Sequence, residues 1–206
     1  MVALEFIKIS SSGAYYATLS DEPDDARALL LQLLHADASY PYSDQLIMDL
    51  TGESQAVSER LFQSLLDRGL VELVPKPIVL VNQSLERTLP DLLPRLSSQG
   101  KVILADDQGF CLGNVGYEEE HAEQLAALSA DIMSLHLRHK HLLNQELNLM
   151  GESWALVDPL GQSQLGVWVF QFSKKRFVLL LEGIPKLNDS AFVYLIGALA
   201  RRYLED

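Results

Sequence analysis

Three histidines near the middle of the chain have the spacing that most resembles a chemical site. His136, His139 and His141 lie close together, and His121 lies a few helical turns earlier. His136 and His139 would share one side of a helix, so both imidazoles could bind one metal ion. A transition-metal site needs a third ligand, and no other residue is fixed at a suitable spacing. We therefore predict no metal and no cofactor, and interpret these histidines as partly buried interface residues.

The remaining reactive side chains form no catalytic motif. The chain contains no glycine-rich phosphate loop with Lys-Ser or Lys-Thr and no Gly-x-Ser-x-Gly elbow, so it is not itself a GTPase or an enzyme of the serine hydrolase type. Cys111 is the single cysteine and lies in a predicted strand, where a structural thiol is usual. The loop from Asp106 to Gly109 has too few oxygen ligands for calcium and predicts a hairpin turn. We predict a protein without catalytic residues.

The composition indicates a globular protein with room for one large or two small domains. Of 206 residues, 48% are hydrophobic and 21% are charged. The net charge of -12 argues against broad affinity for nucleic acid, because binding to the phosphate backbone depends largely on Lys and Arg. The longest uncharged apolar run, over 190–200, is too short to span a membrane, and no targeting segment follows Met1. We expect an acidic, cytoplasmic protein that does not contact membranes.

The first domain, predicted over residues 1–80, should begin with a hairpin. Alternating apolar residues predict strands over 2–9 and 14–19 that turn at 11–13. Four further elements are expected: a helix opened by 21–25, a short helix capped by Ser43 and ending at Leu50, a longer helix capped by Ser54 and ending at Gly69, and a strand over 70–74.

This order of helix, short helix, corner, longer helix and strand resembles a winged helix-turn-helix over roughly residues 24–78. In most such folds the third helix binds DNA. Residues 1–80, however, contain five Lys and Arg against twelve Asp and Glu, a balance of -7. We therefore favour a protein contact at this helix and keep DNA binding as the alternative. The candidate contact residues are Ser54, Gln55 and Glu59.

The second domain, predicted over 81–206, is organised around two strands that are apolar on both faces. In 165–172 and 176–182 both alternating sets of side chains are largely apolar, which indicates a sheet covered by helices on two sides. The short join at 173–175 predicts an antiparallel hairpin. We interpret its tip as a solvated turn, with contact to an acidic partner through Lys174 and Lys175 as the alternative.

The longest predicted helix, over 118–143, has more apolar surface than packing on a sheet requires. Leu128, Leu135 and Leu142 extend its apolar face sideways at a seven-residue spacing. Two antiparallel copies of this helix, one from each subunit of a two-fold dimer, would cover the extra surface. Coverage by the first domain or by an internal loop is the alternative.

The ordered elements of residues 84–204 resemble the roadblock/LC7 family. Residues 102–116 are similar to that family's strand, Asp-x-Gly turn, strand and glycine exit, and 177–182 and 187–191 are similar to its last strand and the lead into its closing helix. The resemblance implies an α+β, profilin-like fold in which a five-stranded antiparallel sheet has one long helix on one face and two on the other. It also implies dimerisation through the long helix and the adjacent edge strand, at Leu128, Ile132, Leu135, Leu142, Trp154 and Leu156.

The same resemblance implies a non-enzymatic role. Family members commonly serve as platforms for small Ras-like GTPases, and some bacterial members activate a GTPase partner. We therefore expect a homodimeric regulatory or scaffold protein that interacts with other proteins, among them a small Ras-like GTPase. Two alternatives remain open: a DNA-binding transcriptional regulator that dimerises through the roadblock half, and a sensor that holds a small molecule on its sheet.

Overall fold

The computed structural model describes residues 4–20, 22, 24–79, 84–149, 151–172 and 175–203, which form two compact units. One unit comprises Met1–Leu85 together with Asn188–Asp206, and the other comprises Glu86–Leu187. The sequence assigns the closing helix α7 (Ser190–Tyr203) to the second domain, whereas its contacts group it with the first unit. The reason is that α7 packs against the two helices α1 (Ser11–Ala17) and α2 (Asp25–His35) of that unit.

The predicted N-terminal hairpin is wrong. Residues Ser11–Ala17 form the helix α1, and β1 (Phe6–Ile9) pairs in antiparallel fashion with β2 (Val71–Val74) instead. The hydroxyl of Ser10 accepts a hydrogen bond from the backbone N–H of Gly13 and so caps α1, which favours a helix over a second strand. The alternation of apolar residues over 14–19 is short, and it predicted a strand where the capped segment forms a helix.

Three further helices follow as expected: α2 (Asp25–His35), α3 (Asp44–Thr51) and α4 (Gln55–Asp67). The side chains of Asp24 and Ser43 cap α2 and α3. Ser54 occupies the N-cap position of α4 but makes no side-chain capping bond. Within residues 4–79, β2 pairs with β1 and no wing strand follows it, so a winged helix is not confirmed.

The second unit contains the predicted five-stranded antiparallel sheet, which confirms the α+β fold class. Its strand order is β4-β3-β7-β6-β5, so that β4 and β5 are the edges. The strands are β3 (Val102–Asp106), β4 (Cys111–Val115), β5 (Trp154–Val157), β6 (Ser163–Phe172) and β7 (Lys175–Glu182), and the helices are α5 (Leu85–Leu92), the 3-10 turn Leu93–Leu96, α6 (Glu119–Lys140) and the π-helical turn His141–Glu146.

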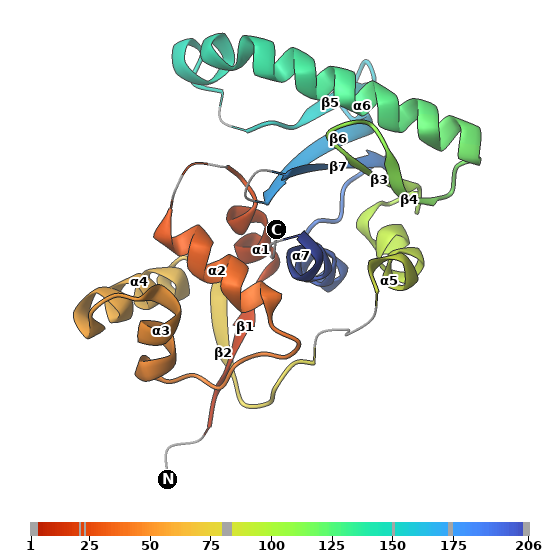
Figure 1. The fold of residues 1–206 in the computed structure, drawn as a ribbon. Coiled ribbons are helices and arrows are strands. Elements are labelled where there is room, and N and C mark those ends of the chain that lie inside the picture. Colours follow the sequence, from red (N-terminus) through yellow and green to blue (C-terminus); the bar gives the residue numbers. More distant parts are fainter. Residues whose placement is uncertain are drawn as a thin grey trace. The chain divides into compact units, whose positions relative to one another are not determined.

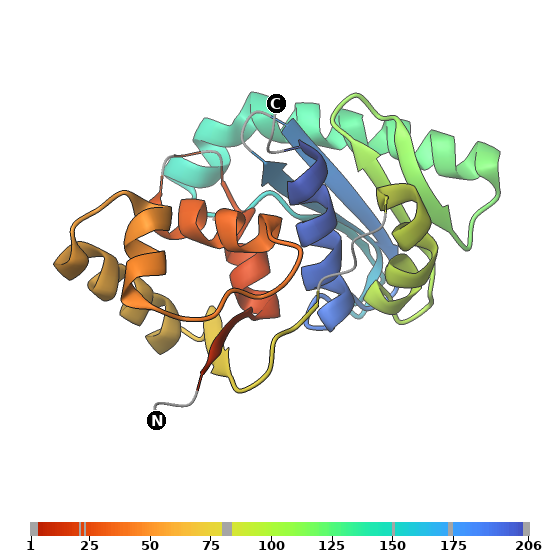
Figure 2. The ribbon, with the colours of Figure 1, turned by 60° about the horizontal axis from the view of Figure 1, so that its bottom comes forward.

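The long helix α6 covers one face of this sheet (Figures 1 and 2). Its buried residues Ala122, Ala126 and Met133 pack on a cluster that includes Ile103 and Leu180 from the central strands. The side chains that point to the other face, including Leu104, Leu179 and Leu181, are also fully buried. The prediction that the central strands are covered on both faces is therefore confirmed.

Two features next to the sheet bear on earlier expectations. The loop after β3 is a hairpin turn as predicted, because Asp106 Oδ1 accepts hydrogen bonds from the backbone N–H groups of Gln108 and Phe110 at 3.0 and 2.9 Å. None of the helices in the described ranges combines the length and hydropathy needed to cross a membrane.

Candidate functional site

Large apolar side chains are exposed along α6, the π-helical turn that follows it and the edge strand β5 of the second unit. Leu128 and Leu135 are each 42% exposed, Leu142 is 43% exposed, and Leu156 on β5 is 65% exposed. Single exposed leucines are ordinary, whereas several on neighbouring elements form a larger apolar surface. We call the surface made by the six predicted interface residues the apolar edge: Leu128, Ile132, Leu135, Leu142, Trp154 and Leu156.

The two remaining members of the apolar edge, Ile132 and Trp154, are partly buried and contact the core. Both pack against the cluster between α6 and the sheet. Trp154 also donates a hydrogen bond from Nε1 to Nδ1 of His136, at 3.2 Å. The hydrogen bond between Trp154 and His136 therefore connects β5 directly to α6.

The backbone of β5 adds a second binding feature to this surface. Among the described residues β5 pairs with β6 and has no strand on its other side. An unpaired strand edge presents backbone N–H and C=O groups to any approaching segment. Val157, beside Leu156, is 59% exposed.

A polar cluster lies behind the apolar edge. The Glu152 carboxylate is 3.6 Å from the ammonium of Lys140, and it accepts a hydrogen bond from the Gln171 side chain at 3.2 Å. Burial lowers the pKa of His136 below its ordinary value; the charge of Glu152 opposes this shift, and the charges of Lys140 and Arg176 add to it.

The histidines do not assemble into a metal site. His136 is buried, His139 is exposed, and His141 pairs with Glu146 at 3.3 Å. Within the part of the chain that the structure describes, no group of three or more His, Cys, Asp or Glu side chains is arranged to hold a metal ion. The hydrogen bond between His136 and Trp154, 18 residues apart, is the part of this site that the spacing of residues did not predict.

The predicted partner contacts outside the apolar edge lie in both units. Ser54, Gln55 and Glu59 are exposed at the start of α4, where the Gln55 side chain donates to Glu59 at 2.7 Å. Lys175 begins β7 and is half-buried, and Lys174 lies outside the described residues. Ser54, Gln55 and Glu59 therefore form one local surface in the first unit, separate in sequence and unit from Lys175.

A cavity of about 410 Å³ lies in the first unit, next to β1 and the N-terminal ends of α1 and α7. Apolar side chains such as Ile9, Leu33 and Val193 line it together with several serines. It is therefore not the small-molecule site on the five-stranded sheet that one of the sequence-based alternatives would require.

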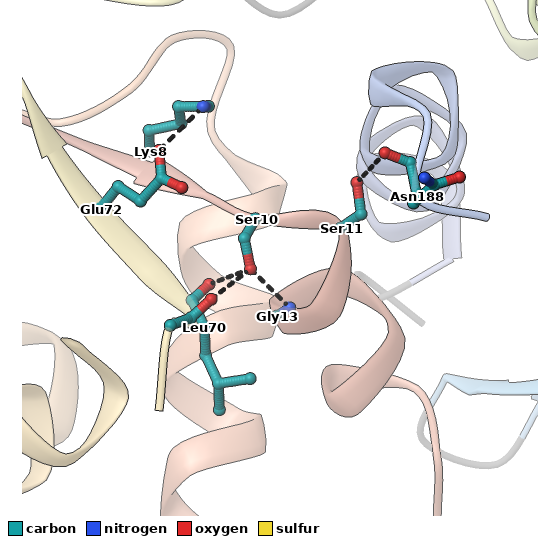
Figure 3. A network of polar contacts seen from close by, with 8 residues as sticks. Lys8, Ser10, Ser11, Gly13, Leu70, Glu72 and Asn188 are labelled. Carbon is teal, nitrogen blue, oxygen red and sulfur yellow. Dashed lines mark hydrogen bonds and ion pairs between the residues drawn. The ribbon is translucent and has the colours of Figure 1, made fainter. Parts of the chain in front are cut away.

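A polar network beside this cavity holds α1 in place (Figure 3). Ser10 Oγ donates to the carbonyl of Gly69 at 2.7 Å while it accepts from Gly13 N–H at 3.0 Å. Ser11 Oγ donates to the carbonyl of Asn188 at 3.1 Å. Ser10 thus connects the start of α1 to the segment that leads into β2.

We expect the replacement Ser10→Ala to lower the free energy of unfolding by about 1–2 kcal/mol, because it removes both a helix cap and a bond to a carbonyl. Urea unfolding followed by circular dichroism measures this loss. Ser12→Ala, an exposed serine of the same helix, is the matched control and should change stability by less than about 0.5 kcal/mol. Equal effects of the two substitutions would contradict the role of Ser10.

Comparisons with known proteins find similar solved structures but no similar sequence family. A scan against protein-family models finds no match, and a search of curated proteins finds none. Among solved structures, this chain is similar to a roadblock/LC7 domain from Streptomyces avermitilis, with a TM-score of 0.36 and 17% sequence identity. The match covers 60% of this chain and 96% of that chain. It is the same family that residues 84–204 resemble in sequence.

Proposed function

We propose that this protein is a non-enzymatic regulatory scaffold that forms a homodimer through the apolar edge. The observation that carries the proposal is the exposure of Leu128, Leu135 and Leu156 on two adjoining elements of one unit. Burial of such side chains in a dimer would contribute roughly 25 cal/mol for each Å² of apolar surface removed from water. A homodimer is the simplest partner because a two-fold axis covers the same patch on both copies at once.

We propose that the two copies of α6 run antiparallel at the two-fold axis. The charged residues of α6 do not select this arrangement. At 100° per residue, Glu123 lies on the opposite side of the helix from Ile132, and Glu120 and Arg138 lie about 120° from it. The apolar side chains therefore carry the proposal.

The positions of the apolar side chains agree with that arrangement. Ile132 lies between Leu128 and Leu135 on one side of α6. In an antiparallel pair centred between Asp131 and Ile132, Leu128 of each subunit faces Leu135 of the other, and the two copies of Ile132 lie close to the axis. The apolar contacts are then continuous along the axis between the helices.

For the dimer we propose a role as a platform for other proteins, with a small Ras-like GTPase as the first class to test. The support is the resemblance of residues 84–204 to roadblock/LC7 domains, which generally act in protein interaction and regulation and are typically non-enzymatic. The exposed start of α4, with Ser54, Gln55 and Glu59, would supply a second protein contact.

DNA binding through α4 is less well supported. Its exposed side chains include Glu59 and Asp67, which accept hydrogen bonds from Gln55 and Gln63 at 2.7 Å each. Carboxylates on this face would repel the phosphate backbone. Salt-sensitive, sequence-selective retention of duplex DNA would favour the transcriptional regulator over the protein scaffold.

Sedimentation velocity on the full chain tests the homodimer. The expected result is a species of twice the 23.0 kDa chain mass that dissociates on dilution. A species of 23.0 kDa at every concentration would contradict the proposal. For the platform role, small GTPases recovered by pull-down from the native host would be purified and tested for direct binding when loaded with GDP or GTP.

A further inference from the structure

His136 joins the long helix α6 to the edge strand β5 through a buried hydrogen bond. Its side chain is only 4% exposed, and its Nδ1 accepts the indole N–H of Trp154 at 3.2 Å. The two rings meet edge to face, with centroids 6.1 Å apart. A nitrogen that accepts a hydrogen bond carries no proton, so this imidazole is neutral and its proton is on Nε2.

The surroundings of His136 offer little compensation for a positive charge. Its Nε2 is buried and has no hydrogen-bond partner among the described residues. The charged groups that act on it are Glu152, which precedes β5, Lys140 one turn further along α6, and Arg176 on β7. Glu152 is the one group that favours the imidazolium, and it is already engaged by Lys140 and Gln171.

We propose that the bond between His136 and Trp154 is a pH-sensitive clamp, which holds β5 against α6 at neutral pH and releases it when His136 is protonated. Protonation places a hydrogen on Nδ1, so that two N–H donors then face each other. It also places a charge in a site with 4% exposure. Both effects favour a structure in which Trp154 has moved away from α6.

The clamp supports the surface that we propose for the homodimer. Trp154 and Leu156 on β5 belong to the apolar edge, as do Ile132 and Leu135 on α6. Release of β5 would separate these two parts of the edge, so acidification would weaken self-association. This last consequence rests on the proposed homodimer, whereas the clamp acts within one chain and is testable without it.

The direction of the pH dependence follows from the lowered pKa of His136. In the unfolded chain the imidazole takes up a proton below its ordinary pKa of about 6.5, while the folded protein resists protonation until a lower pH. The unfolded state therefore binds more protons in that interval. The stability from this site is fully present above about pH 6.5 and is lost as the pH falls toward the folded-state pKa.

The test compares the wild-type protein with His136→Asn at about pH 7.5 and about pH 5.5. The amide oxygen of Asn can occupy the place of Nδ1 and accept from Trp154 without titrating. On acidification, the folding equilibrium constant of the wild type should fall by about fivefold more than that of His136→Asn. His139→Asn, which removes an exposed histidine of the same helix, should retain the wild-type loss.

A spectroscopic measurement reports on the clamp directly. The chain has two tryptophans, so a nitrogen–proton correlation spectrum contains two indole N–H signals, and Trp168→Phe assigns the one from Trp154. The Trp154 signal should shift as the pH falls in the wild type and stay in place in His136→Asn.

Two results would overturn the clamp: an indole signal of Trp154 that is unchanged by pH in the wild type, or an equal loss of stability in His136→Asn. Should His136→Asn not fold, Trp154→Phe removes the donor instead, and it should reduce the pH-dependent loss; an undiminished loss in that variant would also overturn the clamp. A wild-type protein that stays monomeric but shows the Trp154 shift would contradict the homodimer and leave the clamp supported.

Discussion

Replacement of Leu135 by Glu should convert the proposed dimer into a monomer. Leu135 lies on the side of α6 that we place at the two-fold axis, and its side chain is 42% exposed in the single chain. In the antiparallel pair each introduced carboxylate would be buried against apolar side chains without a partner, and symmetry repeats the loss. We expect a cost of about 3 kcal/mol or more, which corresponds to a rise in Kd of roughly a hundredfold.

The same substitution should scarcely affect the fold of the single chain, because exposed positions usually change stability by less than about 0.5 kcal/mol. This separates loss of association from loss of folding. Sedimentation velocity measures the first, and urea unfolding at low protein concentration measures the second.

Leu137→Glu is the matched control for Leu135→Glu. Leu137 is on the same helix and is 43% exposed, but two residues of an α-helix correspond to a rotation of about 200°, so it points away from the proposed axis. We expect Leu137→Glu to remain a dimer. If both variants dissociate equally, or if neither does, the interface does not lie on the side of α6 that carries Leu135.

Gly13→Ala should have the largest effect on stability in the first unit. A Cβ at this position would lie 2.0 Å from the carbonyl oxygen of Leu70 and 3.1 Å from Ile9 Cγ2. The Leu70 oxygen accepts from Ser10 N–H at 3.1 Å, so its displacement would disturb the start of α1 and the pairing of β1 with β2. We expect a loss of about 3 kcal/mol in the free energy of unfolding, measured by urea unfolding.

Gly52→Ala distinguishes lack of space from backbone strain. Gly52 ends α3 with a φ of 69°, and an added Cβ would meet nothing within 4 Å. We expect it to cost only about 1 kcal/mol, from the left-handed conformation alone. A loss at Gly13→Ala no larger than that at Gly52→Ala would show that α1 and the segment before β2 can move apart at little cost.

Much of the fold was predictable because its signals are local. The double apolar alternation of 165–172 and 176–182 predicted strands that are covered on two faces, and both are found in the middle of the sheet as β6 and β7. Asp106 at a turn and Ser43 at a helix start each act through backbone groups two to four residues away. Interactions of such short range depend only on residues that are close in sequence, so the sequence alone predicts them.

The wrong predictions concern residues whose structure depends on contacts with segments far along the chain. The residues 14–19 have some alternation, but Gly13 is in contact with Leu70, which is far along the chain, and β1 takes β2 as its partner. On α4 the buried residues are Ser58, Phe62 and Leu65, whereas Val57 and Leu61 are only partly buried. Phe62 turns inward because its ring stacks on Tyr42, with centroids 4.9 Å apart. A helical wheel contains no information about such a neighbour.

The candidate site divides in the same way. The seven-residue spacing of Leu128 and Leu135 depends only on the geometry of one helix, so the sequence was enough to place these two side chains together on α6, whereas Leu142 lies in the π-helical turn that follows. That Trp154 meets His136 depends on where β5 lies in the sheet, which is set by its pairing with β6. Helix periodicity is a property of neighbouring residues, whereas contact between α6 and β5 required the chain to fold first, and only the tertiary structure could show that a titratable group supports this edge.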